Sequence, residues 1–477
     1  MKGSFYWHDY ETFGTDPSRD RPVQFAGLRT DAELKVISEP LVLYCKPARD
    51  VLPHPEACLL TGITPQKALR EGLCEAEFIA RIHAQLALPG TCAVGYNSIA
   101  FDDEVTRYTL YRNFHDPYER EYRHGNSRWD IIDLLRVAYA LRPQGIVWPR
   151  GDDGRPGFKL EALAQANDIA HEAAHDALSD VNATIALARL VKQQQPRLFD
   201  HVLAQRGKSA VAAMLDIPAM RPVLHISRKF GAERSNIGLV APVARHPSNS
   251  NEVICVDLLQ DPAELADLSV EQISERLFTP AAELPAGMQR PGIKNIRTNR
   301  CPIVLTPKLL DAQAAQRLEI DLQTHWAHAD TLKTLPGLGR KLQEVFAARK
   351  FPVPQHPDQM LYSGGFFNDA DRRAMAWVRD ASPEQLRDEQ VGFEDPRLPQ
   401  MLFLYRARNY PESLDGPERE QWEEYRFRYL TDPEAGASLC LEQYLELIER
   451  MQSASSPSPG EQAILDALLE YSDQLLS

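Results

Sequence analysis

Residues 4–12 of the chain are SFYWHDYET, a stretch rich in aromatic side chains of the kind that favours a β-strand. Asp9 and Glu11 are two positions apart in it, so a strand would place both side chains on the same face. Two neighbouring carboxylates repel each other unless a proton or a cation compensates them. The stretch therefore predicts a strand with an acidic face, which is either a solvated strand end or part of a cation site.

Two more β-prone stretches follow, PVQFAGLRTD at 22–31 and LVLYCKP at 41–47, and the three together predict an antiparallel meander. TCAVGYN at 91–97 is a further short apolar strand. Strands followed by alternating helices indicate an α/β domain over residues 1–195. The helices expected from the spacing of apolar side chains are 75–88, 102–113, 129–141, 159–167 and 176–194.

The rest of the chain has two parts of different character. From about 200 to 350, short β segments alternate with Pro, Asn and Gly, which predicts a smaller β-rich domain, barrel-like, with helical insertions such as 263–277. KFPVPQHP at 350–357 is a proline-rich linker, and the pattern beyond it is helical. The expected domains are 1–195, 196–350 and 358–477.

The composition is that of a soluble globular protein, because 43% of the 477 residues are apolar and 25% are charged. No run of about 18 apolar residues is present, so we expect no membrane span. The N-terminus, MKGSFYWHDYE, has no apolar signal core, so we expect no cleaved leader. The seven cysteines lack CxxC and zinc-site spacings, and reduced thiols in a cytoplasmic protein are expected.

The net charge of −14 argues against a nucleic-acid binder with a basic face. It is a sum over the whole chain, however, and leaves room for a basic groove. RPVLHISRKFGAER at 221–234 and KNIRTNR at 294–300 are locally basic, and each is either a strand contact or a solvated face.

Three more residues complete a candidate catalytic set. Asp102 opens a predicted helix after the strand TCAVGYN, where it is either a cap or a functional carboxylate. His175 and Asp180 in HDALSD are five positions apart and would not share a helix face, so we expect Asp180 one turn into a helix and His175 on the loop before it. A histidine there can accept a proton from water near neutral pH.

If these carboxylates converge, they form an oxygen-rich pocket that suits Mg²⁺ or Mn²⁺. Such a pocket with a nearby histidine suits phosphodiester hydrolysis by two metal ions. The order D-x-E, Asp, then H-x₄-D resembles the DEDD exonucleases of the ribonuclease-H-like superfamily, in the subgroup with the H-x₄-D motif, and TGIT at 61–64 resembles a segment of that family.

The resemblance narrows to the bacterial exodeoxyribonuclease I family and spans nearly the whole chain. The segments that carry it are HDYETFGTDPSRDRPVQFAGLRTD, TGITPQ, GYNSIAFDDEVTR, NSRWDIIDLLRVAYALRPQGIVWP, AHDALSDVNATIALA, YSGGFFNDADR and YRARNYPESLD. It implies a ribonuclease-H-like α/β exonuclease domain, a β-rich SH3-like domain and an all-α C-terminal domain around a single-strand channel. We expect such a protein to act as a monomer in DNA repair and recombination.

By the same resemblance, the catalytic set degrades single-stranded DNA from its 3′ end to 5′-mononucleotides. His175 would deprotonate the attacking water. The carboxylates that would hold two Mg²⁺ ions, for which Mn²⁺ can substitute, are Asp9, Glu11, Asp102 and Asp180.

The resemblance also implies contacts with the substrate. Ile63 in TGIT would wedge against the terminal base, although a buried aliphatic in a turn explains it equally well. Core packing is also the alternative for every aromatic candidate for base stacking. These candidates are Phe13, Tyr96, Phe366 and Phe367.

The expected protein partner is the acidic, hydrophobic-ended C-terminal tail of the bacterial single-stranded-DNA-binding protein. Arg142 is the candidate for its terminal carboxylate, because an arginine fork holds a carboxylate bidentately. Arg317 and Arg340 would add positive charge, and His201 stands where the family has a tyrosine. The alternative is that Arg142 caps the helix 129–141 and interacts with its dipole.

Two other functions use the same residues. A DEDD ribonuclease that trims RNA 3′ ends would have the same catalytic set, and only the remaining 280 or so residues argue against it. A non-catalytic single-strand-binding module would have lost a catalytic carboxylate, and none is missing.

Overall fold

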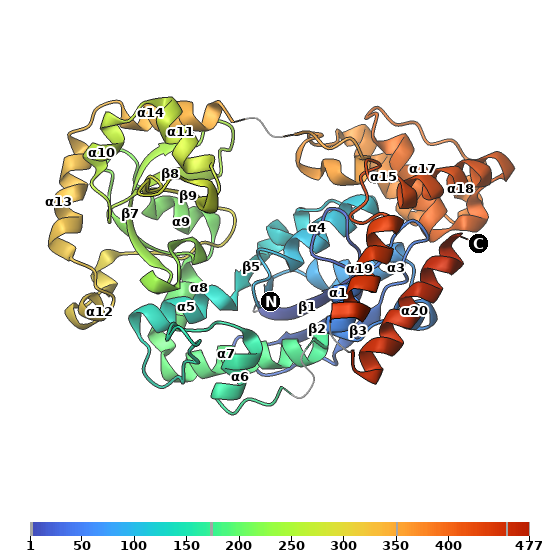
Figure 1. The fold of residues 1–477 in the computed structure, drawn as a ribbon, viewed down its shortest axis with the longest axis horizontal. Coiled ribbons are helices and arrows are strands. Elements are labelled where there is room, and N and C mark those ends of the chain that lie inside the picture. The colour runs from blue at the N-terminus through green and yellow to red at the C-terminus, as the bar shows by residue number, and fades with distance from the viewer. Residues whose placement is uncertain (1–2, 172–174, 350–351, 455–456, 477) are drawn as a thin grey trace. The chain divides into compact units, whose positions relative to one another are not determined.

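The computed structural model describes residues 3–171, 175–349, 352–454 and 457–476 (Figure 1). Its contacts divide the chain into two compact units. Unit 1 comprises Met1–Ser127, His171–Asn182 and Val353–Ser477, and unit 2 comprises Arg128–Ala170 and Ala183–Pro352. This grouping joins the two ends of the chain in one unit and differs from the three expected domains, whose boundaries stay a prediction.

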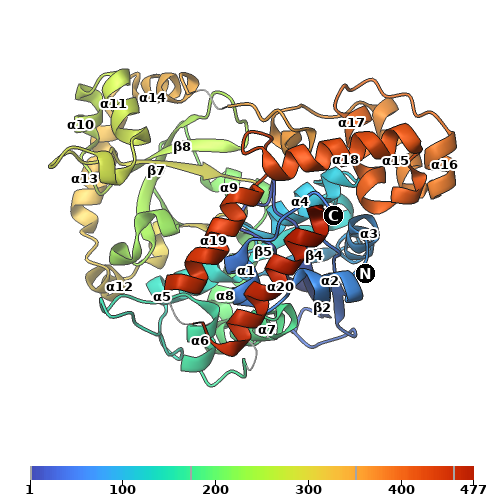
Figure 2. The same cartoon turned by 45° about the vertical axis from the view of Figure 1, so that its right-hand side comes forward.

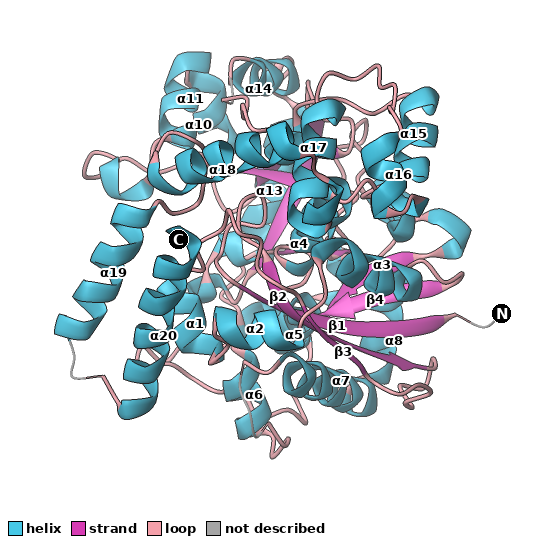
Figure 3. Cartoon of the chain, turned by 90° about the vertical axis from the view of Figure 1, so that its right-hand side faces the viewer, coloured by secondary structure: helices cyan, strands magenta, loops and turns pink. Residues whose placement is uncertain are grey.

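The predicted meander is confirmed in unit 1. Strands β1 (Ser4–Thr12), β2 (Pro22–Thr30) and β3 (Leu41–Tyr44) pair antiparallel in sequence order, and β4 (Thr91–Gly95) pairs parallel with β1 (Figure 3). The register places Glu11 opposite Gln24. The sheet therefore has β1 in its interior, with β2 on one side and β4 on the other.

One face of β1 packs into a hydrophobic core. Tyr6 and Tyr10 belong to a cluster with Phe25 of β2 and with Phe78 of helix α3 (Glu75–Leu86). Side chains alternate along a strand, so Asp9 and Glu11 lie on the face opposite this core. The other N-terminal helices of the unit are α1 (Pro55–Thr61), α2 (Pro65–Glu71), α4 (Asp102–Arg112) and the beginning of α7 (Ala177–Gln194).

The C-terminal part of unit 1 is helical, as predicted. Its last two helices, α19 and α20, pack against each other and against α1, and α20 also packs against α2 (Figure 2). Leu465, Leu468 and Tyr471 of α20 share one buried cluster with Cys58 and Ile63. The helices are α15 (Asp369–Asp380), α16 (Pro383–Asp388), α17 (Leu398–Asn409), α18 (Gly416–Thr431), α19 (Leu441–Ala454) and α20 (Pro459–Leu476).

Unit 2 contains the predicted β-rich region as a sheet of order β10-β6-β7-β8-β9, with every neighbouring pair antiparallel. Its strands are β6 (Val223–Ile226), β7 (Ile237–Arg245), β8 (Glu252–Asp257), β9 (Ile293–Arg297) and β10 (Val304–Leu305). Its helices are α5 (Ile131–Leu141), α6 (Leu160–Ala166), α8 (Pro196–Gln205), α9 (Lys208–Met214), α10 (Pro262–Asp267), α11 (Val270–Phe278), α12 (Ala312–Arg317), α13 (Leu322–Lys333) and α14 (Leu338–Ala347).

Two predicted helices were wrong in detail. Residues 129–130 end strand β5 (Ser127–Asp130), and α5 starts only after Asp130, whose side chain caps it by accepting from Ile132 N. The insertion predicted at 263–277 is two helices, because Ser269 and Gln272 form a capping box that begins α11 anew. Among the described residues, no helix is long and apolar enough to cross a membrane.

A buried ion-pair network joins the two ends of the chain within unit 1. Asp358 Oδ2 accepts from Arg408 Nη1 at 2.6 Å and from Arg21 Nη2 at 3.2 Å, and Asp50 Oδ2 accepts from Arg408 Nη2 at 2.7 Å. Burial raises the pKa of Asp358, but the charges of Arg408, His356 and Arg21 outweigh it and hold the pKa well below its ordinary value. Removing Asp358 would therefore leave two buried arginine side chains, Arg21 and Arg408, with one counter-charge fewer.

We expect Asp358→Ala to lower the free energy of unfolding by about 3–5 kcal/mol, the usual cost of breaking one side of a buried pair. Thermal and urea unfolding of the full chain measure the change. Asp330→Ala is the control, because the Asp330–Lys333 pair is at the surface and its loss should change little. Equal midpoints for Asp358→Ala and wild type would contradict a stabilising role for this network.

Candidate active site

The acidic face of β1 meets the beginning of α4. Asp102 is the first residue of α4, and its Oδ1 accepts a hydrogen bond from the backbone N of Tyr10 at 3.1 Å. This bond ties the start of the helix to the strand between Asp9 and Glu11. Glu11 is buried, at 8% exposure, so it does not belong to a solvated strand end, which was the alternative for β1. Asp102 is also buried, at 4% exposure, and the N-cap position of α4 is Phe101 rather than Asp102.

The H-x₄-D pair joins the same face. Asp180 lies in the first turn of α7, and His175 precedes the helix in a left-handed conformation with φ 63°, so the structure places both where the sequence analysis expected them. Potential ligand atoms of Glu11, His175 and Asp180 all lie within 4.8 Å of one another. Glu11 is more than 160 positions from His175 and Asp180 in the sequence, yet polar atoms of all three residues lie close together.

Electrostatics connect the remaining carboxylates to this point. Burial raises the pKa of Asp9 well above its ordinary value, and the charges of Asp102 and Glu11 raise it further. Burial, then Asp180 and Asp102, raise the pKa of Glu11 to about 8. Burial is also the main cause that raises the pKa of Asp102 to about 7. Carboxylates that raise one another's pKa in this way lie close together, and a bound cation would relieve their mutual repulsion.

The donor set fits a hard divalent cation. Two carboxylates, of Glu11 and Asp180, and the imidazole of His175 offer the converging atoms, and oxygen-rich sets of this kind suit Mg²⁺ and Mn²⁺ better than soft metals. Buried carboxylates without a counter-charge are costly, which gives a physical reason for ions to bind here. The chemistry that such a site can support is activation of water and stabilisation of a leaving oxygen.

The sequence analysis missed two residues that hold this segment in place. His171 Nε2 forms a hydrogen bond of 2.6 Å with Asp180 Oδ1. Gln24 donates from Nε2 to Asp176 Oδ2 at 3.2 Å and accepts from the backbone N of Ala177 at 3.3 Å. Gln24 therefore links β2 to the start of α7. The available signal was its position opposite Glu11 on the neighbouring strand.

Two expected substrate contacts are core residues. Phe13 and Ile63 are 1% and 3% exposed and belong to one hydrophobic cluster with Leu468 and Tyr471 of α20. Their surfaces are covered by protein, so the packing alternative describes them and neither offers a face to a base in this conformation.

The other aromatic candidates differ in exposure. Tyr96 is half-buried just after β4. Phe367 stacks on Tyr111 with centroids 5.9 Å apart and lies under the guanidinium of Arg397. Phe366 is 84% exposed, with only an edge contact to Tyr118. Phe366 is therefore the candidate whose ring is most open to a base.

In unit 2, two of the three candidate partner arginines converge. Arg142 is the C-cap of α5, where it contacts Leu141 O at 2.5 Å and pairs with Asp311 at 3.3 Å. Arg317 donates to Ala140 O of the same helix end. Arg340 lies on α14, at the other end of the unit from α5 (Figure 1). Arg142 thus makes the helix-capping contact of the alternative interpretation, and it also remains one third exposed beside Arg317.

Comparison with protein families matches three consecutive parts of the chain. The family described as Exonuclease matches residues 6–188, the Exonuclease I SH3-like domain matches 206–348, and the Exonuclease I C-terminal domain matches 355–475. The chain is 45% identical to exodeoxyribonuclease I of Escherichia coli K12 over 477 residues, covering 100% of this chain and 99% of that protein. It is 42% identical to exodeoxyribonuclease I of Haemophilus influenzae over 475 residues, covering 99% of each.

Solved structures are similar over the same length. Exonuclease I from Methylocaldum szegediense is 52% identical with a TM-score of 0.96, and all of both chains is covered. The zinc-bound form of an E. coli exonuclease I complex with single-stranded DNA is 44% identical with a TM-score of 0.95 and full coverage of both chains. A structure described as SSB/exonuclease I in complex with the inhibitor CFAM is 44% identical with a TM-score of 0.91, also with full coverage.

Proposed function

This chain belongs to the exodeoxyribonuclease I family, and from that membership we propose that it degrades single-stranded DNA from the 3′ end to 5′-mononucleotides with Mg²⁺. It is an exonuclease and therefore a hydrolase. The observation that carries the proposal is the meeting of Glu11, His175 and Asp180 at one point, in a chain that matches the family over its full length. Roles in DNA repair and recombination and a cytoplasmic location are parts of the same proposal.

The carboxylates of Asp9, Glu11, Asp102 and Asp180 would hold the metal ions. Two bound Mg²⁺ ions, or Mn²⁺ in their place, would supply Lewis-acid stabilisation of the charge that develops on the scissile phosphate.

His175 is the proposed general base. Its place on the loop before α7 puts the imidazole beside Glu11 and Asp180, where it would take the proton of the attacking water. His171 and Gln24 are positioning residues in this scheme, since they contact Asp180 and the residues just before it. The leaving group is the 3′ oxygen of the penultimate nucleotide, and the product carries the phosphate on its 5′ carbon.

We expect single-stranded DNA to be hydrolysed at least about tenfold faster than the matching RNA or blunt duplex. A channel for one strand excludes a duplex, whose major groove alone is about 12 Å wide. The measurement uses oligonucleotides labelled at the 5′ or the 3′ end, with Mg²⁺. Early release of the 3′ label as a mononucleotide supports the proposed direction. Faster release from RNA would favour the end-trimming ribonuclease, and binding without hydrolysis of any substrate would favour the non-catalytic module.

A second part of the proposal concerns a protein partner, the C-terminal tail of the single-stranded-DNA-binding protein. The similar SSB/exonuclease I structure supports it, as does the pair of arginines, Arg142 and Arg317, at the end of α5. Arg142 already pairs with the carboxylate of Asp311, which a terminal carboxylate would replace.

We expect Arg142→Ala to weaken binding of a fluorescent acidic peptide ending in Pro-Phe by about tenfold, the loss of one charge-assisted bidentate contact. Fluorescence anisotropy measures it. Arg221→Ala is the control, because Arg221 is a solvent-exposed arginine of the same unit. Equal affinity for Arg142→Ala and wild type, or no loss when the terminal Phe is deleted, would exclude this pocket.

A further inference from the structure

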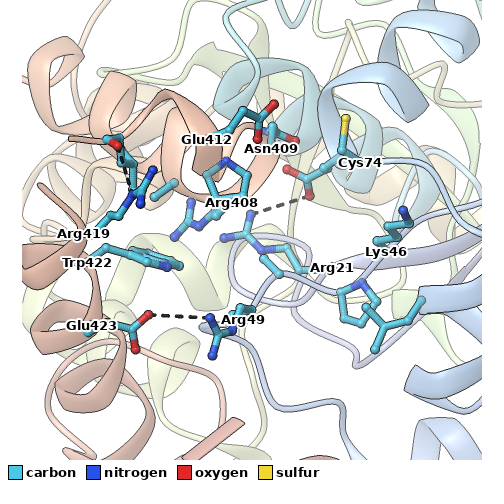
Figure 4. A pocket seen from close by; sticks show the side chains of 17 residues that line it. Arg21, Lys46, Arg49, Cys74, Arg408, Asn409, Glu412, Arg419, Trp422 and Glu423 are labelled. Carbon is cyan, nitrogen blue, oxygen red and sulfur yellow. Dashed lines mark hydrogen bonds and ion pairs between the residues drawn. The ribbon is translucent and has the colours of Figure 1, made fainter. Parts of the chain in front are cut away.

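A cavity of about 620 Å³ lies within unit 1, and it shares no residue with the catalytic cluster (Figure 4). Its walls come from the segments around Lys46–Arg49 and Leu69–Glu75 and from the 407–423 region of α17 and α18. The volume is within the range of about 300–1,000 Å³ that small-molecule sites occupy. The cavity therefore has the size of a binding site and lies where the two ends of the chain meet.

The most unusual group in its wall is Arg21. The residue is only 5% exposed, yet its Nε and Nη1 atoms have no hydrogen-bond partner among the described residues. Glu75 Oε1 is 3.8 Å from Nη1, which is an ion pair beyond hydrogen-bond reach. Only Nη2 is engaged, by Asp358. Buried donors on a cation are costly when unpaired, so this guanidinium is suited to receive an anion. Both atoms are covered by protein, so the Arg21 side chain has to turn toward the cavity before an anion can reach them.

The rest of the wall divides into a cationic part and an apolar part. Lys46, Arg49 and Arg419 are exposed and contribute three more positive charges, and Figure 4 shows Arg49 paired with Glu423 across the opening. The apolar part is formed by Leu69, Leu414, Trp422 and neighbouring alanine and proline residues. In total, five cationic and three acidic side chains line the cavity: Arg21, Lys46, Arg49, Arg408 and Arg419 against Glu75, Glu412 and Glu423.

We propose that this cavity binds a small phosphate monoester with an apolar ring system, of the nucleoside monophosphate class, with the phosphate at Arg21 and the ring against the apolar wall. A phosphate monoester carries close to two negative charges and three acceptor oxygens, which suits several cations and a guanidinium with two unpaired nitrogen atoms better than a single carboxylate does. The site goes beyond the proposed exonuclease function, because it needs neither the catalytic carboxylates nor a metal ion.

One backbone hydrogen bond connects the cavity wall to the segment that follows the catalytic strand β1. The carbonyl of Arg21 accepts a hydrogen bond from Phe13 N at 2.9 Å, and Phe13 follows β1, which carries Asp9 and Glu11. A ligand that orders Arg21 therefore acts on the hairpin between β1 and β2.

The test is isothermal titration of the full-length protein in EDTA with deoxyadenosine 5′-monophosphate, inorganic phosphate and adenosine as separate probes. We expect the nucleotide to bind at least about tenfold more tightly than adenosine, because adenosine lacks the charged group that Arg21 receives. Phosphate should bind more weakly than the nucleotide, because it makes no contact with the apolar wall.

Arg21→Lys keeps the charge but removes the planar fork, so nucleotide affinity should fall about tenfold. Arg112→Lys is the matched control, because Arg112 is buried in the same network through Glu75 but does not line the cavity. Thermal unfolding shows whether each variant is folded. If neither is, the rim variant Lys46→Ala/Arg49→Ala replaces them, with Arg123→Ala as an exposed control elsewhere. The rim variant should bind the nucleotide several-fold more weakly, and Arg123→Ala should bind it unchanged.

Several results would overturn the proposal. These are no measurable binding of the nucleotide at millimolar concentration, equal affinities for nucleotide and adenosine, or unchanged affinity in both Arg21→Lys and the rim variant. Asp180→Asn separates this site from the catalytic cluster, since cavity binding must persist in that variant. Loss of nucleotide binding in Asp180→Asn would assign the ligand to the active site instead, while failure of exonuclease activity alone would leave the cavity result intact.

Discussion

Asp180→Asn is expected to lower the rate of single-stranded DNA hydrolysis by about 10³-fold, because metal-assisted stabilisation of a developing charge contributes several kcal/mol and each 1.36 kcal/mol is tenfold in rate. Asp180 is central to the site: it lies with Glu11 and His175 at one point and raises the pKa of both Asp9 and Glu11. Initial rates on a 5′-labelled oligonucleotide, with saturating Mg²⁺, measure the loss. Fluorescence anisotropy should show DNA affinity within a few-fold of wild type.

Asp176→Asn is the matched control for this variant. Asp176 is also an acidic residue of the same segment, but it accepts from Gln24 and is not among the residues whose ligand atoms converge. Its replacement should reduce the rate less than about tenfold, as outer-shell changes usually do. Removal of metal by EDTA should abolish hydrolysis in wild type. Undiminished activity in EDTA, or equal losses in the two aspartate variants, would contradict a metal site built on Asp180.

The residues of the catalytic set could be predicted because each has a local signal. Asp9 and Glu11 alternate on a stretch of strand-forming residues, Asp102 follows an apolar strand, and a histidine with an aspartate five residues later begins a helix. The strands themselves were predictable for the same reason, since alternation and turn residues are properties of neighbouring positions. The resemblance to the exonuclease family then indicated that these separate residues belong to one site.

The supporting contacts had no signal of this kind. Gln24 reaches the start of α7 across 153 positions, and only the strand register shows that it lies on the face of Glu11. His171 stands four residues before His175, and nothing local in the sequence indicates that it reaches Asp180; only the resemblance to the H-x₄-D motif singled out His175 as the candidate base. The roles of Gln24 and His171 depend on the pairing of strands and on contacts between side chains that are distant in the sequence.

The burial of Phe13 and Ile63 could not be predicted from the sequence for a related reason. Phe13 lies two positions after Glu11 and Ile63 lies in the TGIT segment, but helix α20, about 400 or more positions away, covers both. The Arg21 cavity has the same origin, because its walls come from both ends of the chain. The helix break before Ser269, in contrast, could have been predicted, because Ser269 and Gln272 have the S-x-x-Q spacing of a capping box.

The second large effect is expected for His175→Ala, which should lower the rate of hydrolysis by about 10²–10⁴-fold, the usual contribution of a general base. The imidazole lies beside Glu11 and Asp180, where water would be activated, and its left-handed backbone keeps it outside α7. Because the base acts on the water and not on the strand, DNA affinity should change little. Single-turnover rates and anisotropy titrations on the same oligonucleotide separate the two quantities.

His171→Ala distinguishes a base from a positioning residue. His171 contacts Asp180 directly at 2.6 Å, so its loss should loosen that carboxylate and weaken metal binding, which a higher Mg²⁺ requirement would reveal. Saturating Mg²⁺ should then restore most of the activity of His171→Ala and none of that of His175→Ala. Added imidazole should do the reverse, because it can replace a missing proton acceptor but not a missing hydrogen bond to Asp180. If the activity of His175→Ala instead recovers with Mg²⁺ and does not recover with imidazole, the role of His175 is to position the metal ligands, and the base must be another group.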